Sequence, residues 1–360
     1  MRYSFNLPIN PFSFGQISTA ILRGLFSLNK DVLIYPYGGQ VNLSSQEENA
    51  DFLKWLSEGV SLFDKEHSRK SGCFKIWHLN GGLESLSENH LLMTFYELDS
   101  PTKEEINIAK NCSKLIFTSK ETQKTFKEAA NVDSFYVPLF FDDKNFHRKE
   151  KEYFKDERIV FNLTGKFEKR KHHKKIIGAW VKKYGNNKKY SLQCSIYNSF
   201  LPEEKNRSLF SESLNGEKVN NVQFFGFFEK NSQYNDYLNS SDIVLAMSGG
   251  EGWGLPEFHS VALGKHAVVL NAHGYKEWAT EENSVLLNPN GKIEAYDNVF
   301  FFKGGSFNQG NIYDFNEDDF ISACEIAVKK VESQRTNSKG LELQQKFSCE
   351  NSVREILKLF

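Results

Sequence analysis

The sequence lacks the short signatures of several common enzyme classes. It has no Gly-x-Gly-x-x-Gly run after a strand-like segment and no phosphate-binding loop with a Walker lysine, which argues against a dinucleotide-dependent dehydrogenase and a P-loop nucleotidase. It also has no Gly-x-Ser-x-Gly elbow and no cysteine in a reactive setting. A hydrolase with a nucleophilic triad is therefore not indicated.

The net charge is also small, the cysteines are few and the apolar runs are short. The formal net charge is -1, so the overall charge predicts neither a polyanion nor a membrane as partner. No apolar run approaches the roughly 18 residues of a membrane span. The opening residues MRYSFNLPIN are expected to form a first β-strand rather than a signal peptide. The five cysteines are scattered without zinc-ligand spacing, which favours reduced thiols in a cytoplasmic protein.

The chain instead shows two runs in which strand-like and helix-like segments alternate. Its 360 residues leave room for two domains, and strands separated by helices predict a parallel sheet in each run. A charged segment over residues 142–158 interrupts the alternation. We predict a first domain over 1–148, a second over 149–330, and a helical tail over 331–360 that packs back toward the first domain.

The stretch SGGEGWGLPEFHSVALG, residues 248–264, predicts a glycine-rich turn that leads from a strand into a helix. Pro256 suits the first helical turn and Gly264 the cap after the last one. The unpaired backbone N–H groups of such a turn form an anion site. The carboxylate of Glu251 beside it is better suited to accept hydrogen bonds from hydroxyl groups on whatever carries the anion. An anion together with hydroxyls describes a nucleotide sugar.

A second anion site is predicted where the second run of elements begins. The strand VFNLTG ends at Gly165, and Lys166 and Lys171 follow on the loop to the next helix. Two cations on one such loop can clamp a diphosphate and stabilise the charge of a departing nucleotide. The rest of KRKHHKK is expected to be a solvated basic face, because residues 144–189 hold sixteen Lys and Arg against five Asp and Glu.

These motifs together resemble one enzyme family. SGGEGWGLPEFHSVALGKHAVVL resembles the signature of family-4-like retaining glycosyltransferases, and GKFEKRK is similar to the phosphate-binding loop of that family. MTFYELDSP, KLIFTSKETQKTF and YVPLFFD resemble its first-domain strands and the crossing to its second domain. The resemblance covers about residues 1–290. It implies the GT-B fold, an α/β architecture in which two Rossmann-like parallel-sheet domains face a central cleft.

The resemblance also implies roles for individual residues. Glu251 would hold the hydroxyls of the donor sugar, while Lys166 and Lys171 would hold its diphosphate. Backbone amides that assist with the diphosphate are expected in the first loop near Gly15, and in the glycine-rich turn at Gly252, Trp253, Gly254 and Leu255.

Recognition of the nucleoside falls to a second group of residues. Base contacts are expected from Tyr197, at a strand end, and from Phe227 in the turn at residues 226–228. The family's second Glu, which would bind the ribose hydroxyls, is replaced here by His259. A histidine can accept one hydrogen bond and donate another, so His259 is expected to govern nucleotide recognition, with a core position as the alternative.

The acceptor side of the cleft departs from the family too. Many relatives carry a histidine near the sugar where this chain reads Thr94-Phe95-Tyr96-Glu97, and His78 ends another strand. Glu97 and His78 each either line the active site or serve as a local cap. No Asp-x-Asp pair, which holds a metal in the other large glycosyltransferase fold, is present. We therefore expect no essential metal and no cofactor beyond the nucleotide sugar.

The combined reading is a retaining hexosyltransferase that uses a nucleoside diphosphate sugar such as UDP-glucose. The expected acceptor is a hydroxyl of a glycan or a lipid-linked sugar. The alternatives are transfer to modified DNA bases, another fate for the donor such as hydrolysis, and a non-catalytic sugar-nucleotide-binding protein. A cytoplasmic location is expected, and the basic 144–189 region leaves open a peripheral contact with the inner membrane face or with nucleic acid.

Overall fold

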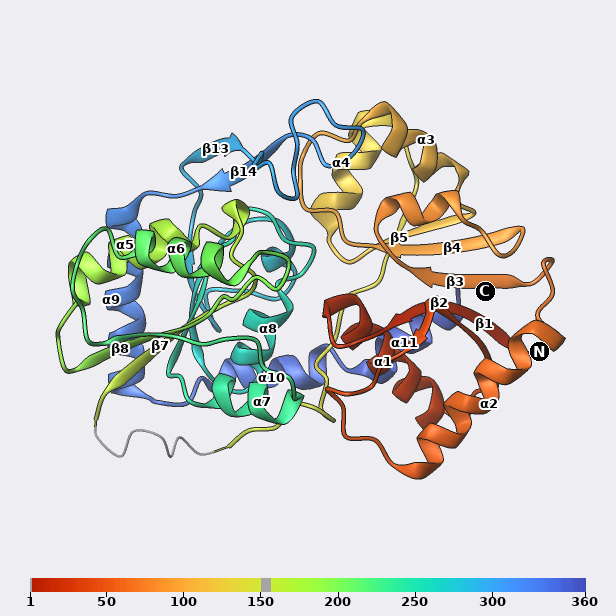
Figure 1. Ribbon diagram of the computed structural model, residues 1–360, viewed down its shortest axis with the longest axis horizontal. Coiled ribbons are helices and arrows are strands. Elements are labelled where there is room, and N and C mark those ends of the chain that lie inside the picture. The colour runs from red at the N-terminus through yellow and green to blue at the C-terminus, as the bar shows by residue number, and fades with distance from the viewer. Residues whose placement is uncertain (1, 150–156) are drawn as a thin grey trace.

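The computed structural model describes residues 2–149 and 157–360, which form two α/β units side by side (Figure 1). The first contains a six-stranded, wholly parallel sheet with strand order β2-β1-β3-β4-β5-β6. Its elements are β1 (Tyr3–Ile9), α1 (Ser13–Ser27), β2 (Val32–Val41), α2 (Ala50–Glu66), β3 (Gly72–Ile76), the 3-10 helix η1 (Leu79–Leu83), β4 (Asn89–Thr94), α3 (Lys103–Asn111), β5 (Lys114–Phe117), α4 (Lys120–Ala130) and β6 (Phe135–Tyr136).

The second unit repeats this plan with the strand order β12-β11-β10-β7-β8-β9, again all parallel. The alternation predicted from the sequence is confirmed in both units, whereas α6 and β12 were not predicted. The elements are β7 (Ile159–Thr164), η2 (Lys169–Lys171), α5 (His173–Tyr184), β8 (Tyr190–Ser195), α6 (Glu203–Ser213), β9 (Val222–Phe224), α7 (Asn231–Asn239), β10 (Ile243–Ala246), α8 (Leu255–Ala262), β11 (His266–Leu270), η3 (His273–Glu277) and β12 (Val285–Leu287).

A hairpin arm, residues 291–314, reaches from the second unit to the first. It consists of the antiparallel strands β13 (Gly291–Glu294) and β14 (Asn311–Asp314) and the long loop between them, which lies beside α3 and α4 in Figure 1. Lys292 Nζ lies 2.9 Å from Asp99 Oδ2, and the backbone N–H of Asn308 donates to Glu105 Oε1 at 2.8 Å. The arm therefore joins the two units along one edge of the cleft.

The C-terminal helices make a second connection. After α9 (Glu317–Ser333), α10 (Ser338–Lys346) packs on α8, and α11 (Cys349–Leu357) packs on α1 of the first unit. The ring of Phe360 lies 5.1 Å from that of Tyr3 and 5.6 Å from that of Phe5. The tail thus packs on the first unit. The predicted domain boundary at 148–149 adjoins residues 150–156, which lie outside the described residues.

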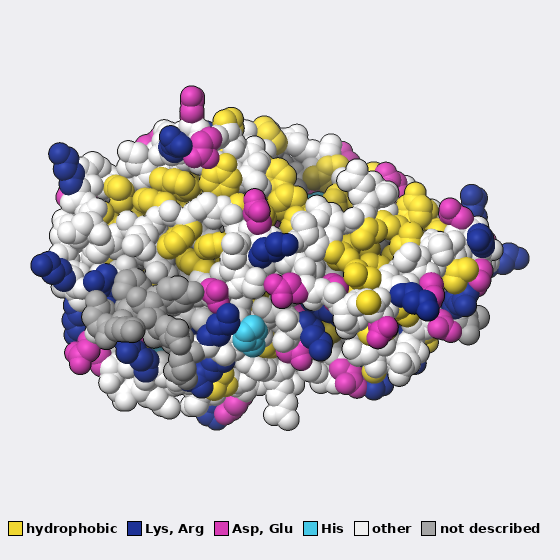
Figure 2. All heavy atoms as spheres, turned by 60° about the horizontal axis from the view of Figure 1, so that its bottom comes forward, with side chains coloured by type: hydrophobic (Ala, Val, Ile, Leu, Met, Phe, Trp, Pro, Cys, Tyr) yellow, Lys and Arg dark blue, Asp and Glu magenta, His cyan; other side chains and the backbone are white. Residues whose placement is uncertain are grey.

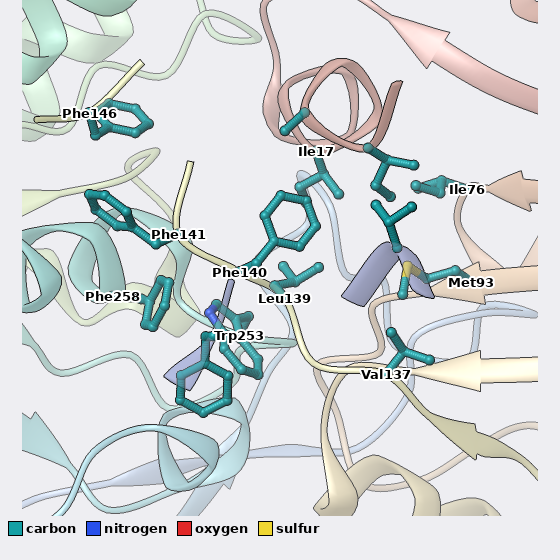
Figure 3. Close-up of a cluster of buried hydrophobic side chains, with 14 of the residues drawn as sticks. Ile17, Ile76, Met93, Val137, Leu139, Phe140, Phe141, Phe146, Trp253 and Phe258 are labelled. Atoms are coloured by element: carbon teal, nitrogen blue, oxygen red, sulfur yellow. The ribbon is translucent and has the colours of Figure 1, made fainter. Parts of the chain in front are cut away.

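The segment that crosses between the units is itself part of the core. Figure 3 shows Val137, Leu139, Phe140 and Phe141 running from one unit to the other. One cluster of buried side chains continues from Ile17, Ile76 and Met93 of the first unit through this segment to Trp253 and Phe258 of the second. Burial of large apolar side chains contributes roughly 1.5–3 kcal/mol each. This shared core therefore stabilises the contact between the two units.

The surface over residues 144–189 is less basic than its sequence suggests. On the face drawn in Figure 2, Lys and Arg side chains are interspersed with Asp and Glu. Four lysines of the segment pair with carboxylates elsewhere: Lys149 with Asp236, Lys174 with Glu212, Lys183 with Glu325 and Lys189 with Glu332. Contact with a membrane or nucleic acid through this segment stays a prediction. Within the described residues, no helix is long and apolar enough to cross a bilayer.

Candidate functional site

Both predicted anion loops lie at the point where the second sheet reverses its strand order. β7 and β10 are hydrogen-bonded neighbours, and the chain proceeds from β7 to one side of the sheet and from β10 to the other. The two connections leave the sheet in opposite directions, which opens a crevice at the carboxyl ends of the strands, where open α/β sheets bind ligands. One connection carries Lys166 and Lys171 and the other Glu251, so the fold brings the two motifs together.

Glu251 occupies the centre of this crevice. Its Oε1 atom accepts hydrogen bonds from Arg170 Nη1 at 2.7 Å and lies 2.6 Å from Lys171 Nζ. Burial alone would raise the pKa of Glu251, but the two cations lower the pKa to about 2. The carboxylate is therefore ionised at any physiological pH. The structure thus brings Glu251 directly against two cations of the second predicted loop. That this loop binds an anion stays a prediction.

Arg170 belongs to this site although the sequence analysis did not select it. Its Nη1 also donates to the carbonyl of Gly250 at 2.8 Å, its Nε lies 2.7 Å from Glu168 Oε2, and its Nη2 lies 3.1 Å from Glu97 Oε1. Glu97 follows β4 of the first unit, so the arginine spans the cleft. The run KRKHHKK does not indicate that Arg170, like Lys171, faces buried carboxylates.

Glu97 is the acceptor-side residue that the structure brings to the cluster. The pKa of Glu97 is raised to about 7, and burial is the largest cause. The neighbouring carboxylates Glu251 and Glu168 also raise this pKa, whereas the cations Arg170 and Lys166 lower it. Between two neighbouring carboxylates and one guanidinium, Glu97 can exchange a proton near neutral pH. His78 lies at the end of β3 with an exposed ring packed edge-on against Phe14 at 4.7 Å.

The basic run KRKHHKK is mostly buried, contrary to the expectation of a solvated face. Arg170, Lys171, His172 and His173 are each 7% exposed or less, because the 3-10 helix η2 folds the run under the glycine-rich turn. His172 Nε2 lies 2.8 Å from the carbonyl of Tyr313, and the buried carboxylates balance the two cations. Lys174 is exposed as expected, but Lys175 is half-buried.

Lys166 lies at the rim of the site rather than beside Lys171. Its Nζ is 2.7 Å from Glu168 Oε1 and lies over the rings of Phe300 and Phe200, at 4.4 and 5.0 Å. Its side chain is 40% exposed. Both predicted phosphate ligands are therefore already paired with carboxylates, Lys166 with Glu168 and Lys171 with Glu251. An incoming diphosphate would have to replace these partners.

The glycine-rich turn fits tightly against its surroundings. A Cβ atom on Gly250 would lie 2.3 Å from the carbonyl oxygen of Glu97, and one on Gly254, where φ is +77°, would lie 2.1 Å from the Tyr275 ring. The first unit thus packs directly on the turn, and only glycine leaves room for this. Of the other predicted amides, Gly252 precedes Trp253, whose ring is buried, Leu255 begins α8, and Gly15 lies in the first turn of α1.

The predicted base-binding residues lie near the opening of the cleft. Phe227 is 47% exposed, and its ring is 6.1 Å from that of Phe12 in the first unit. Phe12 also lies 5.9 Å from Phe200, so aromatic rings from both units meet there. Tyr197 follows β8, and a hydrogen bond with Glu203 raises its pKa. Contact of Tyr197 and Phe227 with a nucleotide base stays a prediction.

His259 lies apart from the Glu251 cluster. It is 3% exposed, and its ring is 4.3 Å from that of Phe146 and 5.6 Å from that of Phe141. Both phenylalanines belong to the buried cluster that Figure 3 shows. Burial lowers the pKa of His259 to about 4, so the imidazole is neutral at physiological pH. Its surroundings are those of a core histidine.

The carboxylate of α8 that faces the site is Glu257. Its Oε1 lies 3.8 Å from Lys171 Nζ, and its side chain is buried. Glu257 was not predicted as a site residue, because the family signature places its second Glu two residues later, at His259. On a helix these two positions are about 200° apart, so only one of them can face the cations.

The arrangement of His259 predicts a structural role. His259→Ala should lower the melting temperature by several degrees, because loss of a buried ring costs about 1–3 kcal/mol, while the donor Michaelis constant stays unchanged. Thermal unfolding and donor titration measure the two quantities. His147→Ala, which removes an exposed imidazole, is the control and should change neither the melting temperature nor the donor Michaelis constant. A raised Michaelis constant with normal stability would restore the ribose-binding role instead.

Among residues 2–149 and 157–360, no three His, Cys, Asp or Glu side chains are grouped so that they could hold a metal ion. The side chains of the cluster offer three kinds of interaction: Arg170 and Lys171 carry positive charges that can attract an anion, Glu251 and Glu257 can accept hydrogen bonds from hydroxyls, and Glu97 can exchange a proton.

Comparison with known proteins supports the fold described above. A family model described as "Glycosyl transferases group 1" matches residues 143–299, and solved glycosyltransferase structures superpose on the whole chain. The fold is GT-B. A sucrose-phosphate synthase from Thermosynechococcus elongatus matches with a TM-score of 0.69 at 12% identity, covering 100% of this chain and 94% of that one.

Two further GT-B structures match over almost their whole length. HepE from Anabaena, in complex with UDP-glucose, has a TM-score of 0.67 at 14% identity and is covered completely, as is this chain. An α,α-trehalose 6-phosphate synthase from Burkholderia multivorans has a TM-score of 0.66 at 9% identity, covering 100% of this chain and 98% of that one. No curated protein matches by sequence. These likenesses establish the GT-B fold, and the predicted two-domain architecture is confirmed.

Proposed function

We propose that this GT-B protein is a retaining glycosyltransferase that moves a hexose from a UDP-glucose-like donor to a hydroxyl of a glycan or lipid-linked sugar. The observation that carries the proposal is the opposition of Glu251 to two buried cations, Arg170 and Lys171, in the crevice between the units. The match to glycosyl transferases group 1 over residues 143–299 supports sugar transfer. The UDP-glucose in the HepE structure supports the donor class.

The donor diphosphate would take the place that the carboxylates now hold. Lys171 would exchange Glu251 for the phosphates, Lys166 would exchange Glu168, and the N-terminal amides of α8 would add hydrogen bonds. These groups stabilise the negative charge that develops on the departing nucleotide. Glu251, released from Lys171, would accept hydrogen bonds from the sugar hydroxyls, and Glu257 is placed to do so for the ribose.

The acceptor would approach from the first unit. Glu97 lies on that side of the cleft, and its pKa of about 7 suits a group that accepts a proton from an attacking hydroxyl at neutral pH. In this proposal the ionised form of Glu97 is active, so turnover should rise as the pH increases through about 7.

The proposal is tested by incubating the protein with a panel of nucleotide sugars, with and without glycan and lipid-linked acceptors. A transferase releases nucleotide faster when the acceptor is present. Release that is independent of any acceptor would indicate a hydrolase. Binding of a nucleotide sugar without release would indicate a non-catalytic protein.

Activity should persist after chelation of divalent metals. The reason is that Lys166, Arg170 and Lys171 supply three positive charges around the proposed diphosphate position. Turnover in excess EDTA, compared with turnover after restoring magnesium or manganese, measures this. Loss of activity in EDTA that either metal restores would contradict the metal-independent mechanism.

A further inference from the structure

Arg170 makes more polar contacts across the cleft than its place in a basic run indicates. Each nitrogen of its guanidinium lies within ion-pair distance of a different carboxylate: Nε is 2.7 Å from Glu168, Nη1 2.7 Å from Glu251, and Nη2 3.1 Å from Glu97. The contact from Nη1 to Glu251 is also a hydrogen bond. The first two partners come from the second unit and the third from the first. A planar fork of five N–H donors can meet three carboxylates at once, which a lysine ammonium cannot do in the same geometry.

The backbone of Arg170 holds the same turn that carries Glu251. The N–H of Gly249 donates to its carbonyl at 2.8 Å, and Ser248 Oγ donates to the same carbonyl at 3.2 Å. The residue is therefore fixed at both ends, by its carbonyl and by its guanidinium. Its side chain is 8% exposed, so solvent screens these charges little.

The partners of Arg170 do not depend on it equally. Glu251 keeps Lys171 at 2.6 Å and Glu168 keeps Lys166 at 2.7 Å if the arginine is removed. Glu97 has no other ion pair in the described part of the chain. The charged groups that act on it are Arg170, Glu251, Glu168 and Lys166, and two of these four repel its ionised form. Loss of Arg170 would therefore affect Glu97 more than Glu251 or Glu168.

We propose that Arg170 is a positioning residue that ties Glu97 of the first unit to Glu251 of the second, and so fixes the acceptor-side carboxylate at the donor site and keeps it ionised for the reaction. This inference rests on the proposed function, because it assigns Glu97 a part in the transfer step. Arg170 acts through the two carboxylates and needs no contact with the substrate.

The protonation of Glu97 gives a readout that a merely structural arginine would not change. Loss of the guanidinium removes the main charge that favours the carboxylate form, so the pKa of Glu97 should rise by about 1 pH unit or more in Arg170→Gln. The pH below which turnover falls should rise with it. The wild-type and variant carboxyl titrations are followed by ¹³C NMR with labelled glutamate, and the Glu97 signal is assigned from its absence in Glu97→Gln.

Two further variants complete the design. Lys169→Gln removes one positive charge from the neighbouring exposed position of the same 3-10 helix and should change neither the titration nor the pH profile. Arg170→Lys keeps the charge but not the fork, so it should leave the Glu97 titration near that of the wild type and lower kcat about tenfold or more. Arg170→Lys also serves if Arg170→Gln does not fold.

The outcomes separate this inference from the proposed function. An unchanged Glu97 titration in Arg170→Gln, or wild-type kcat in Arg170→Lys, would overturn the role of Arg170. The titration needs no substrate. If the wild type transfers sugar from no donor while the Glu97 pKa still rises in Arg170→Gln, the link between the two residues is supported and the proposed transferase activity fails.

Discussion

Glu251→Gln is expected to lower turnover at least about a hundredfold, a loss of roughly 2.7 kcal/mol of transition-state stabilisation. The substitution keeps the size of the side chain but removes the charge that faces Arg170 and Lys171 at 2.7 and 2.6 Å. It therefore weakens the hydrogen bonds that Glu251 would make to the donor sugar. Steady-state kinetics with the donor that the wild type uses measures the effect.

The same substitution should also lower the thermal stability of the free protein, and nucleotide binding should offset this loss. Sequence considerations alone suggest that stability hardly changes, but the structure shows that Glu251 compensates two buried cations. Glu251→Gln should therefore lower the melting temperature, because removal of one partner leaves buried charge unpaired. Free nucleoside diphosphate should restore much of the loss, since its phosphates supply the missing negative charge.

The control for both effects is Glu204→Gln, which removes a carboxylate from the exposed start of α6 and should change neither turnover nor stability. Near-normal turnover of a folded Glu251→Gln protein would exclude the assigned role. A melting temperature that nucleoside diphosphate raises no more than in the wild type would contradict the exchange of Glu251 for phosphate.

Lys171→Ala should weaken the binding of free UDP by about 10- to 100-fold, which corresponds to about 1.4–2.7 kcal/mol for a charge-assisted contact. Lys171 is buried, so its charge acts at close range with little screening. Lys166→Ala should have a smaller effect, because that side chain is 40% exposed. Isothermal titration calorimetry gives the dissociation constants.

Lys174→Ala is the matched control, because Lys174 is an exposed residue of α5 that pairs only at 3.4 Å with Glu212. Lys175 is unsuitable as a control, since its Nζ lies 2.7 Å from Asp314. Equal losses at positions 166, 171 and 174 would mean that a diffuse basic surface, rather than the Glu251 crevice, binds the nucleotide.

The alternation of strands and helices and the two loops that carry Glu251 and Lys171 were predictable because their signals are local. Runs such as VFNLTG and DIVLAMS are strands by composition alone, and a glycine-rich turn before Pro256 marks the start of a helix. Parallel strands place their carboxyl ends on one edge of a sheet. Glu251, Lys166 and Lys171 therefore had to lie near one cleft once the alternation of elements was read.

The hairpin arm over residues 291–314 was not predictable in the same way. Its strands have only four residues each, β13 is exposed throughout, and the loop between them contains three glycines and few periodic positions. Such a segment gains its structure from contacts with Asp99 and Glu105 of the first unit. Those partners are about 200 positions away in the chain, and local sequence does not indicate them.

The sequence by itself thus determined the two α/β units and which loops lie close together, because hydrophobic periodicity and turn chemistry act over a few residues. The resemblance of its motifs to a glycosyltransferase family implied the GT-B fold. Only the tertiary structure decided which charged side chains face the site and which face solvent. A run such as KRKHHKK reads the same whether it faces water or buried carboxylates, and the helix phase that turns Glu257 toward Lys171 and His259 into the core depends on packing. Arg170 became part of the site because Glu97, from the other unit, completes its surroundings.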